Sequence, residues 1–195
     1  MRIIAGKYRS RLLKSLKGDA LRPTSDRLRE TLFNILGAGV AGARFLDVFA
    51  GTGAVGIEAL SRGASEAVFI EKHAAAAKLI RRNLDSLAIR SGATIIQAAA
   101  LFALQKLAAP SSRSKPPINL VFVDPPYAAH DAYSSVLKFL GSDEATFLAT
   151  DAFIIFEHHH KFALSETCGH LTRTRLLKQG DAALSFFRLV QHMKN

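Results

Sequence analysis

The chain of 195 residues has a single cysteine, Cys168, and no tryptophan. One thiol cannot form an internal disulfide, nor can it build a zinc site that needs several thiolates. So few cysteines are typical of a reducing compartment, and we therefore expect a cytoplasmic protein. The sequence also lacks a run of about 18 uninterrupted apolar residues, which argues against a membrane-spanning helix. Its first residues have no long apolar stretch behind their charge, which argues against a secretory signal.

Acidic residues are absent from the first 18 positions, although these carry six basic side chains: Arg2, Lys7, Arg9, Arg11, Lys14 and Lys17. The whole chain has 26 Lys and Arg against 16 Asp and Glu, a net charge of +10. This arm therefore supplies +6, and the other 177 residues supply +4. A basic arm on a nearly balanced body indicates a polyanionic partner, most often a nucleic acid. A solubilising tail is the alternative.

The rest of the chain alternates between strand and helix patterns. After an arm with short strands at 2–5 and 10–16, Thr24 or Ser25 is expected to cap a helix that ends at Gly37. We then expect strands at 44–49, 67–71, 94–97, 118–123 and 152–157, with helices at 54–62, 73–89, 98–107 and 131–140 between them. Segments 171–177 and 184–190 are expected to form a terminal hairpin. The pattern predicts an α/β fold with a mostly parallel sheet covered by helices on both faces, as one domain over 25–195 behind a basic arm over 1–24.

A glycine-rich turn follows the first of these strands. Gly51, Gly53 and Gly56 match G-x-G-x-x-G at a strand-to-helix junction, where a ligand can lie against the backbone. Glu71 ends the next strand and is placed to accept hydrogen bonds from a ribose. The pattern fits a dinucleotide or S-adenosylmethionine. Asp47, four residues before Gly51, favours S-adenosylmethionine, because a carboxylate repels a pyrophosphate but attracts the ammonium of a methionine group.

The second motif is Asp124-Pro125-Pro126-Tyr127, directly after the strand at 118–123. Prolines end a strand sharply, so the carbonyls of Asp124 and Pro125 are expected to point into the cleft without sheet partners. Acceptors of this kind can bind both hydrogens of a planar amine and stabilise the positive charge that develops as its nitrogen attacks a methyl carbon. Tyr127 offers a ring on which a base can stack. The motif therefore predicts methyl transfer to an amino group.

These motifs together resemble the class I, Rossmann-like, S-adenosylmethionine-dependent amino-methyltransferases. More narrowly, the chain resembles the bacterial RsmD family, which methylates the 2-amino group of one guanine in 16S (small-subunit) ribosomal RNA. The resemblance covers nearly the whole chain. Its segments are Arg2–Gly6, Leu21–Asn34, Asp47–Arg62 and Val121–Tyr127. The resemblance implies a mostly parallel seven-stranded sheet, and we expect a monomer that acts on ribosomal RNA or on an assembling or complete small subunit.

The resemblance also implies roles for single residues. Asp124, Pro125, Pro126 and Tyr127 would hold the guanine and form the catalytic set. The cofactor set would be Asp47, Phe49, Ala50, Gly51, Thr52, Gly53, Glu71, Lys72, Gln97 and Ala99. The RNA set would be Arg2, Lys7, Arg9, Arg11, Arg22, Thr24 and Arg27. Alanine at position 99 departs from the polar residue that the family often has against the adenine, so backbone or Gln97 is expected to make that contact.

Several other assignments remain open on sequence grounds. A DNA adenine-N(6) methyltransferase shares the Asp124–Tyr127 motif but usually carries an added domain. A glutamine methyltransferase of release factors resembles the chain but has asparagine in place of Asp124. A nicotinamide dehydrogenase needs a further substrate region, and a non-catalytic RNA-binding protein would not need Asp124. We expect no metal at His158, His159 and His160, because neighbours on an extended strand point to opposite faces.

Overall fold

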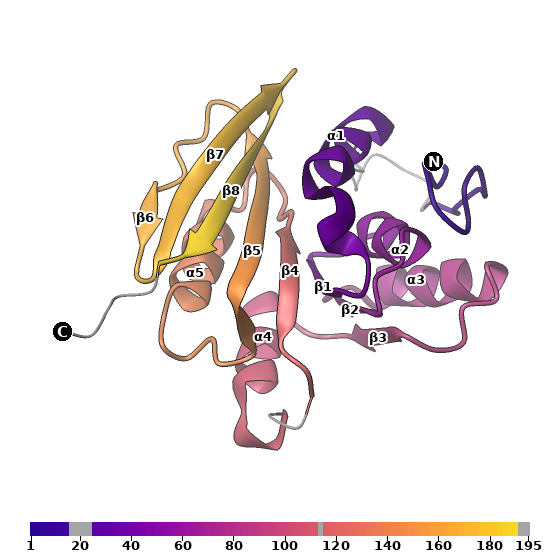
Figure 1. Cartoon of the computed structure of the whole chain (residues 1–195), viewed down its shortest axis with the longest axis horizontal. Coiled ribbons are helices and arrows are strands. Elements are labelled where there is room, and N and C mark those ends of the chain that lie inside the picture. The colour runs from indigo at the N-terminus through magenta and orange to yellow at the C-terminus, as the bar shows by residue number, and fades with distance from the viewer. Residues whose placement is uncertain (16–24, 113–114, 191–195) are drawn as a thin grey trace. The chain divides into compact units, whose positions relative to one another are not determined.

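The computed structural model describes residues 1–15, 25–112 and 115–190, and the chain divides into two compact units, Met1–Ala99 and Ala100–Asn195 (Figure 1). Each unit contains its own paired strands with helices packed beside them. The predicted Arg22 and Thr24 contacts lie outside the described residues. No helix in the described ranges is long and apolar enough to cross a membrane.

The first unit is built around three parallel strands in the order β3, β2, β1. Its elements are α1 (Asp26–Leu36), the 3-10 helix η1 (Gly37–Val40), β1 (Arg44–Val48), α2 (Ala54–Ser61), β2 (Glu66–Ile70), α3 (Ala74–Ser86) and β3 (Ala93–Ile96). Every residue of β1 is buried, including the charged Arg44 and Asp47. Ser25 caps α1 by accepting a hydrogen bond from the Leu28 N–H at 3.1 Å, as predicted.

The first 15 residues do not form the two regular strands expected for them. Their antiparallel pairing is limited to one bridge between Arg2 and Leu12, flanked by hydrogen bonds such as that from the Ser10 N–H to the Ile3 carbonyl. Ile3 and Leu13 are buried in a core cluster of the first unit. Other backbone groups of the arm bond to side chains of α2 and α3, which limits the regular pairing within the arm.

The second unit contains five strands in the order β4, β5, β8, β7, β6. Its elements are α4 (Ala100–Ala108), the 3-10 helix η2 (Pro110–Ser112), β4 (Ile118–Val123), α5 (His130–Leu140), β5 (Leu148–His159), β6 (Thr167–Cys168), β7 (Leu171–Gln179) and β8 (Ala182–Leu189). β4 and β5 are parallel, and the other pairs are antiparallel. The predicted terminal hairpin is confirmed as β7 and β8.

The predicted α/β class is confirmed, and most elements lie within a few residues of their expected bounds. β4 has the bounds that were predicted. β5 is longer than expected, because it begins at Leu148 and continues to His159. The described residues contain eight strands in place of the seven expected, the addition being the two-residue β6.

Candidate cofactor and substrate sites

Asp47, the last residue but one of β1, anchors the start of α2. Its Oδ2 accepts a hydrogen bond from the Gly56 N–H at 2.9 Å, and the side chain is almost fully buried. Gly56 lies in the first turn of α2, where backbone N–H groups have no partner within the helix. A pyrophosphate would need these same groups. The arrangement therefore fits a cofactor without phosphate better than a dinucleotide.

Burial raises the pKa of Asp47 from 3.8 to about 7, and the negative charge of Glu71 acts in the same direction, whereas the hydrogen bond from Gly56 opposes the shift. A carboxylate in this environment is costly to ionise on its own. A cation beside it would favour ionisation. Asp47 is thus suited to receive the ammonium group of a ligand.

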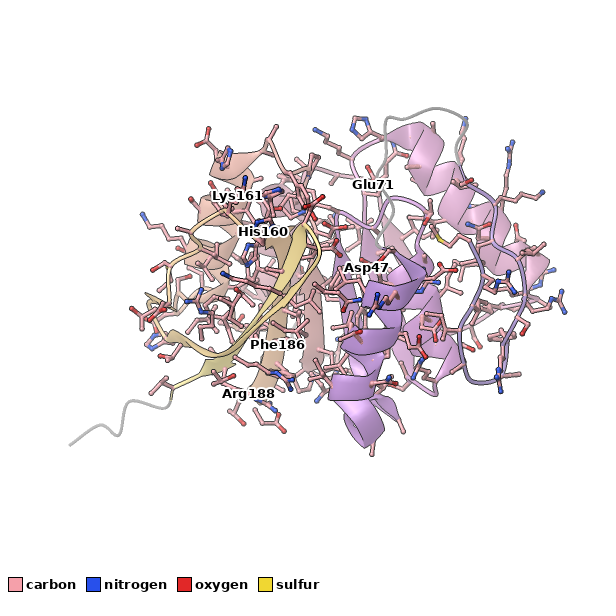
Figure 2. All side chains as sticks on the ribbon, turned by 90° about the horizontal axis from the view of Figure 1, so that it is seen from above. Asp47, Glu71, His160, Lys161, Phe186 and Arg188 are labelled. Atoms are coloured by element: carbon pink, nitrogen blue, oxygen red, sulfur yellow. The ribbon has the colours of Figure 1, made fainter. Side chains whose placement is uncertain are left out.

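Glu71 connects the glycine turn to the end of β2. Its Oε2 accepts from the Gly51 N–H at 2.9 Å, and its Oε1 accepts from the His73 N–H at 2.8 Å. Figure 2 shows Glu71 and Asp47 labelled in the first unit. The two acids hold the turn at both ends, so its backbone is fixed before any ligand arrives.

The three glycines of the turn are needed for different reasons. Gly51 and Gly53 have positive φ values of 53° and 76°, which favour glycine. A Cβ on Gly56 would lie 2.3 Å from the ring of Phe69, so this glycine allows α2 to pack closely on β2. A Cβ on Gly51 would meet only the carbonyl of Phe49, 4.0 Å away. Gly51 is therefore the point where a ligand can approach the backbone, and the turn fits S-adenosylmethionine.

Phe49, also in the predicted cofactor set, has a φ of 67°. This value is strained for a bulky residue, and strain of this kind is concentrated at functional sites. Ala50 donates to the Ile70 carbonyl and accepts from the Gly53 N–H, which closes the turn. The structure thus brings Phe49 and Ala50 to the same turn as Asp47.

The remaining predicted cofactor residues lie in the glycine turn or just after strands of the same unit. Thr52 is buried, and its carbonyl accepts from Asn83 Nδ2 at 3.0 Å. Lys72 is exposed just after β2. Gln97 and Ala99 are exposed after β3. The exposed Gln97 side chain is consistent with the expected contact to an adenine, which stays a prediction.

The Asp124–Tyr127 motif directly follows the buried β4 in the second unit. The Pro125 carbonyl accepts a hydrogen bond from the Tyr133 hydroxyl of α5 at 3.0 Å, a side-chain partner that sequence reasoning did not foresee. That this carbonyl has no partner in the sheet and points into the cleft stays a prediction. Pro126 accepts from the Ala129 N–H at 2.7 Å, which forms a tight turn.

Tyr133 is a buried support for this motif. Burial, followed by the negative charge of Asp124, raises the pKa of Tyr133 above its ordinary range. The hydroxyl therefore stays protonated and donates to Pro125 at any working pH. Sequence reasoning missed this residue, since a tyrosine on an amphipathic helix looks like an ordinary core residue.

The histidine run is divided by the structure. His158 is buried and bonded to Ser185 Oγ at 2.8 Å, and burial lowers its pKa. It is therefore neutral and has a structural role. The ring of His159 meets Tyr127 edge-on, with the ring centroids 5.5 Å apart. One member of the run thus orients the tyrosine of the substrate motif.

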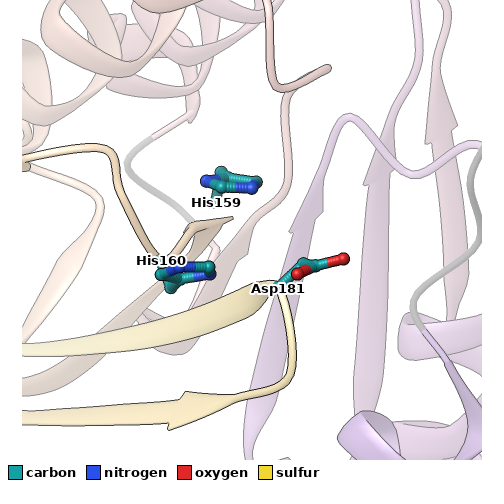
Figure 3. A group of neighbouring side chains, drawn as sticks. All are labelled: His159, His160 and Asp181. Carbon is teal, nitrogen blue, oxygen red and sulfur yellow. The ribbon is translucent and has the colours of Figure 1, made fainter.

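His159 and His160 lie on the same side, contrary to the expected alternation, because β5 ends at His159 and the chain turns (Figure 3). Their rings stack 4.6 Å apart, and with Asp181 they bring potential metal-ligand atoms within 4.8 Å of one another. However, His159 Nδ1 accepts the Lys161 N–H at 3.1 Å, which leaves the proton on Nε2. A metal at His159 would have to break this contact, so the absence of a metal remains our prediction.

The predicted RNA residues that the structure describes are exposed. Arg2, Lys7, Arg9 and Arg11 lie on the arm, and Arg27 lies on α1. Two buried polar residues that sequence reasoning missed, Glu58 on α2 and Asn83 on α3, hold the arm's backbone. Their partners are more than 50 residues away, so no local pattern points to them.

The solved structure of a putative methyltransferase, yhhF, from Escherichia coli is similar to this chain, with a TM-score of 0.78 and 33% sequence identity over 97% of this chain and 98% of that one. The fold is therefore that of the α/β methyltransferases. A model of the family described as conserved hypothetical protein 95 matches residues 1–188. The chain belongs to this family, the RsmD family.

Two curated relatives support this membership. The putative rRNA methyltransferase YlbH of Bacillus subtilis (strain 168) is 34% identical over 188 residues, which are 96% of this chain and 98% of that protein. The ribosomal RNA small subunit methyltransferase D of Escherichia coli (strain K12) is 42% identical over 127 residues. That second match spans 65% of this chain and 60% of the relative.

Proposed function

We propose that this protein transfers a methyl group from S-adenosylmethionine to the exocyclic 2-amino group of a guanine in small-subunit ribosomal RNA. The observation that carries the proposal is the Asp124–Tyr127 turn, held on buried β4 and braced by Tyr133. The names of the two curated relatives support ribosomal RNA as the substrate.

The glycine turn supports the choice of cofactor. Asp47 would face the ammonium of the methionine group. Burial raises the pKa of Asp47 and so disfavours its ionised form, which a cationic neighbour would stabilise. Gly51 leaves room for the ligand against its backbone, and Glu71 would accept from the ribose hydroxyls. When bound, S-adenosylmethionine supplies a methyl group on a positively charged sulfur.

The substrate motif supports an amine as acceptor. The carboxylate of Asp124 would accept an N–H of the guanine amino group, which favours a pyramidal nitrogen with an available lone pair. As that lone pair forms the new bond to carbon, the nitrogen becomes positive, and Asp124 stabilises this charge. Tyr127, oriented by His159, would stack on the base, worth about 1–3 kcal/mol. The cationic product then loses its proton without a strong base.

Methyl transfer tests the proposal directly. The protein is incubated with radiolabelled S-adenosylmethionine and small subunits from cells that lack the endogenous activity, and the RNA is digested to nucleosides. We expect label in 2-methylguanosine, and labelling about 10²–10³-fold slower with the Asp124→Ala variant. Label in methyladenosine would keep the fold and cofactor but overturn the guanine assignment. Cofactor binding without transfer to small subunits or to free 16S RNA would overturn ribosomal RNA as the substrate.

A further inference from the structure

Hydrogen bonds hold the described part of the basic arm, residues 1–15, against the rest of the first unit. The Ile4 and Ala5 N–H groups donate to the two carboxylate oxygens of Glu58 at 2.8 and 3.0 Å. Ser61 Oγ donates to the Ala5 carbonyl at 2.6 Å and accepts from the Tyr8 N–H at 3.0 Å. The arm therefore has a defined position relative to the helices beneath it.

Gly6 shows how closely the arm approaches α2. Its φ is 82°, and a Cβ built on it would lie 1.9 Å from the carbonyl oxygen of Ser61. The neighbouring Lys7 N–H donates to that same oxygen at 2.7 Å. No other residue type fits this contact. The close packing of Gly6 on Ser61 therefore fixes the position of the turn that carries Lys7 and Arg9.

The last described residues of the arm are bound to α3. The Lys14 N–H donates to Asn83 Oδ1 at 2.9 Å, and Asn83 Nδ2 donates back to the Lys14 carbonyl at 3.1 Å. The Arg11 guanidinium donates to the Ser86 carbonyl at 3.2 Å. The arm thus lies along the flank of α3 that Asn83 and Ser86 mark.

Lys78 and Arg82 continue this flank onto the exposed face of α3. Lys78, Arg82 and Ser86 are spaced four residues apart, so their side chains form one stripe along the helix. Both basic side chains are exposed, and Arg82 is one turn from the Ser86 that Arg11 contacts. The basic residues of the arm and of α3 therefore lie next to each other.

Most of the charge on this surface is positive. The 15 described residues of the arm contain five basic residues and no acidic one. The acidic residue of α3, Asp85, is neutralised by Arg90 at 2.8 Å. A predominantly positive surface that is already held in place attracts a polyanion without the entropy cost of ordering a flexible tail.

We propose that the RNA-binding surface of this protein extends beyond the arm onto α3, with Lys78 and Arg82 contacting RNA phosphates beside Arg11 and Lys14. This inference rests on the proposed function, because it takes the substrate to be ribosomal RNA. It adds two residues on a helix that neither the sequence motifs nor the fold assigns to RNA binding.

The test compares three double variants in binding to 16S RNA over a range of salt concentrations. Each phosphate contact contributes about 0.7–0.9 to the slope of log affinity against log salt. We expect K78Q/R82Q to lower that slope by about 1.4–1.8. The matched pair K138Q/K178Q, which removes two exposed charges from the second unit, should keep the wild-type slope. K78R/R82K, which retains the charges, should also keep it.

Two outcomes would overturn the proposal that α3 contacts RNA. One is a wild-type slope for K78Q/R82Q. The other is an equally lowered slope for K138Q/K178Q, because the change would then follow from the net charge of the protein and not from the position of the residues. Binding of S-adenosylhomocysteine by K78Q/R82Q at the wild-type level shows that its fold is intact. Methyl transfer by the wild type, measured in the same series, separates the two proposals. If the wild type transfers no methyl group, the proposed function fails, whereas the slopes still decide where RNA binds.

Discussion

Asn83 Nδ2 donates a hydrogen bond to the carbonyl of Thr52, 3.0 Å away, from a fully buried position on α3. The same amide group also bonds to the backbone of Lys14. Thr52 belongs to the glycine turn, and Lys14 belongs to the basic arm. One side chain therefore supports both the predicted cofactor site and the predicted RNA surface.

The variant Asn83→Ala tests this shared support. It leaves the Thr52 carbonyl and the backbone of Lys14 without their partner, and an unsatisfied buried group costs about 1–3 kcal/mol. We expect a loss of that size in urea unfolding, together with weaker binding of S-adenosylhomocysteine in calorimetry. The exposed Asn34→Ala on α1 serves as control. Wild-type values for Asn83→Ala in both measurements would contradict the role.

Glu58 is the second buried side chain that holds the arm. It accepts hydrogen bonds from the arm's backbone and also lies beside positively charged arginine side chains. Its Oε1 lies 2.7 Å from Arg62 Nε, and its Oε2 lies 3.8 Å from Nε of the fully buried Arg29. Glu58→Gln removes this negative charge and leaves the half-exposed Asp26, 3.1 Å from Arg29 Nη2, as the remaining carboxylate beside the buried Arg29. Breaking a buried pair typically costs about 3–5 kcal/mol. We expect a loss of that order in chemical unfolding.

The exposed pair of Asp85 and Arg90 provides the comparison. Surface pairs contribute about 0–1 kcal/mol, so Asp85→Asn should leave stability nearly unchanged. If Glu58→Gln were as mild as Asp85→Asn, the negative charge of Glu58 would contribute little to the stability of the fold.

Sequence reasoning succeeded where the signal was local. β4 was placed correctly because its apolar run is bounded by Pro117 and by the Asp124-Pro125 pair, and prolines mark strand ends. The Ser25 cap was predictable for a similar reason, since a short polar side chain precedes an amphipathic helix. In both cases, the residues that determine the element are neighbours in the chain.

Contacts between distant residues were not predictable. Glu58 and Asn83 bond mainly to backbone groups of the arm. Every residue has the same backbone groups, so the sequence does not show which of them a distant side chain will bind. These contacts take up backbone groups of the arm, and its antiparallel pairing is limited to the bridge between Arg2 and Leu12. The contact of Tyr133 with Pro125 was also hidden, because the pattern of α5 shows only that Tyr133 faces the core.

Asp47 makes stability depend on pH. Its folded pKa of about 7 lies above its ordinary value of 3.8, so the contribution of Asp47 is largest below pH 3.8 and is lost as the pH rises to 7. Asp47→Asn removes this loss, while an amide oxygen can still accept from Gly56. We expect the variant to melt above the wild type at pH 8, by about 2–4 °C per kcal/mol, and to lose that advantage near pH 4.

The same carboxyl group makes cofactor binding depend on pH in the opposite direction. An ammonium requires ionised Asp47, so the affinity for S-adenosylhomocysteine should fall by up to about tenfold per unit below pH 7. The affinity of Asp47→Asn should be lower and flat over the same interval. A wild-type affinity that does not change between pH 7 and 5.5 would place the ammonium elsewhere.

Asp124 should act on transfer and not on cofactor binding. Asp124→Ala removes the carboxylate that would accept from the guanine amino group, and the loss of one such acceptor costs about 10²–10³ in kcat. Asp124→Asn retains one acceptor oxygen, so we expect an intermediate rate. S-adenosylhomocysteine affinity should stay at the wild-type value in both variants, because the predicted cofactor residues all belong to the first unit. Asp131→Asn, an exposed carboxyl group on α5, is the matched control and should leave kcat unchanged. Parallel losses of cofactor affinity and kcat in Asp124→Ala would show that the residue supports the fold instead of the reaction.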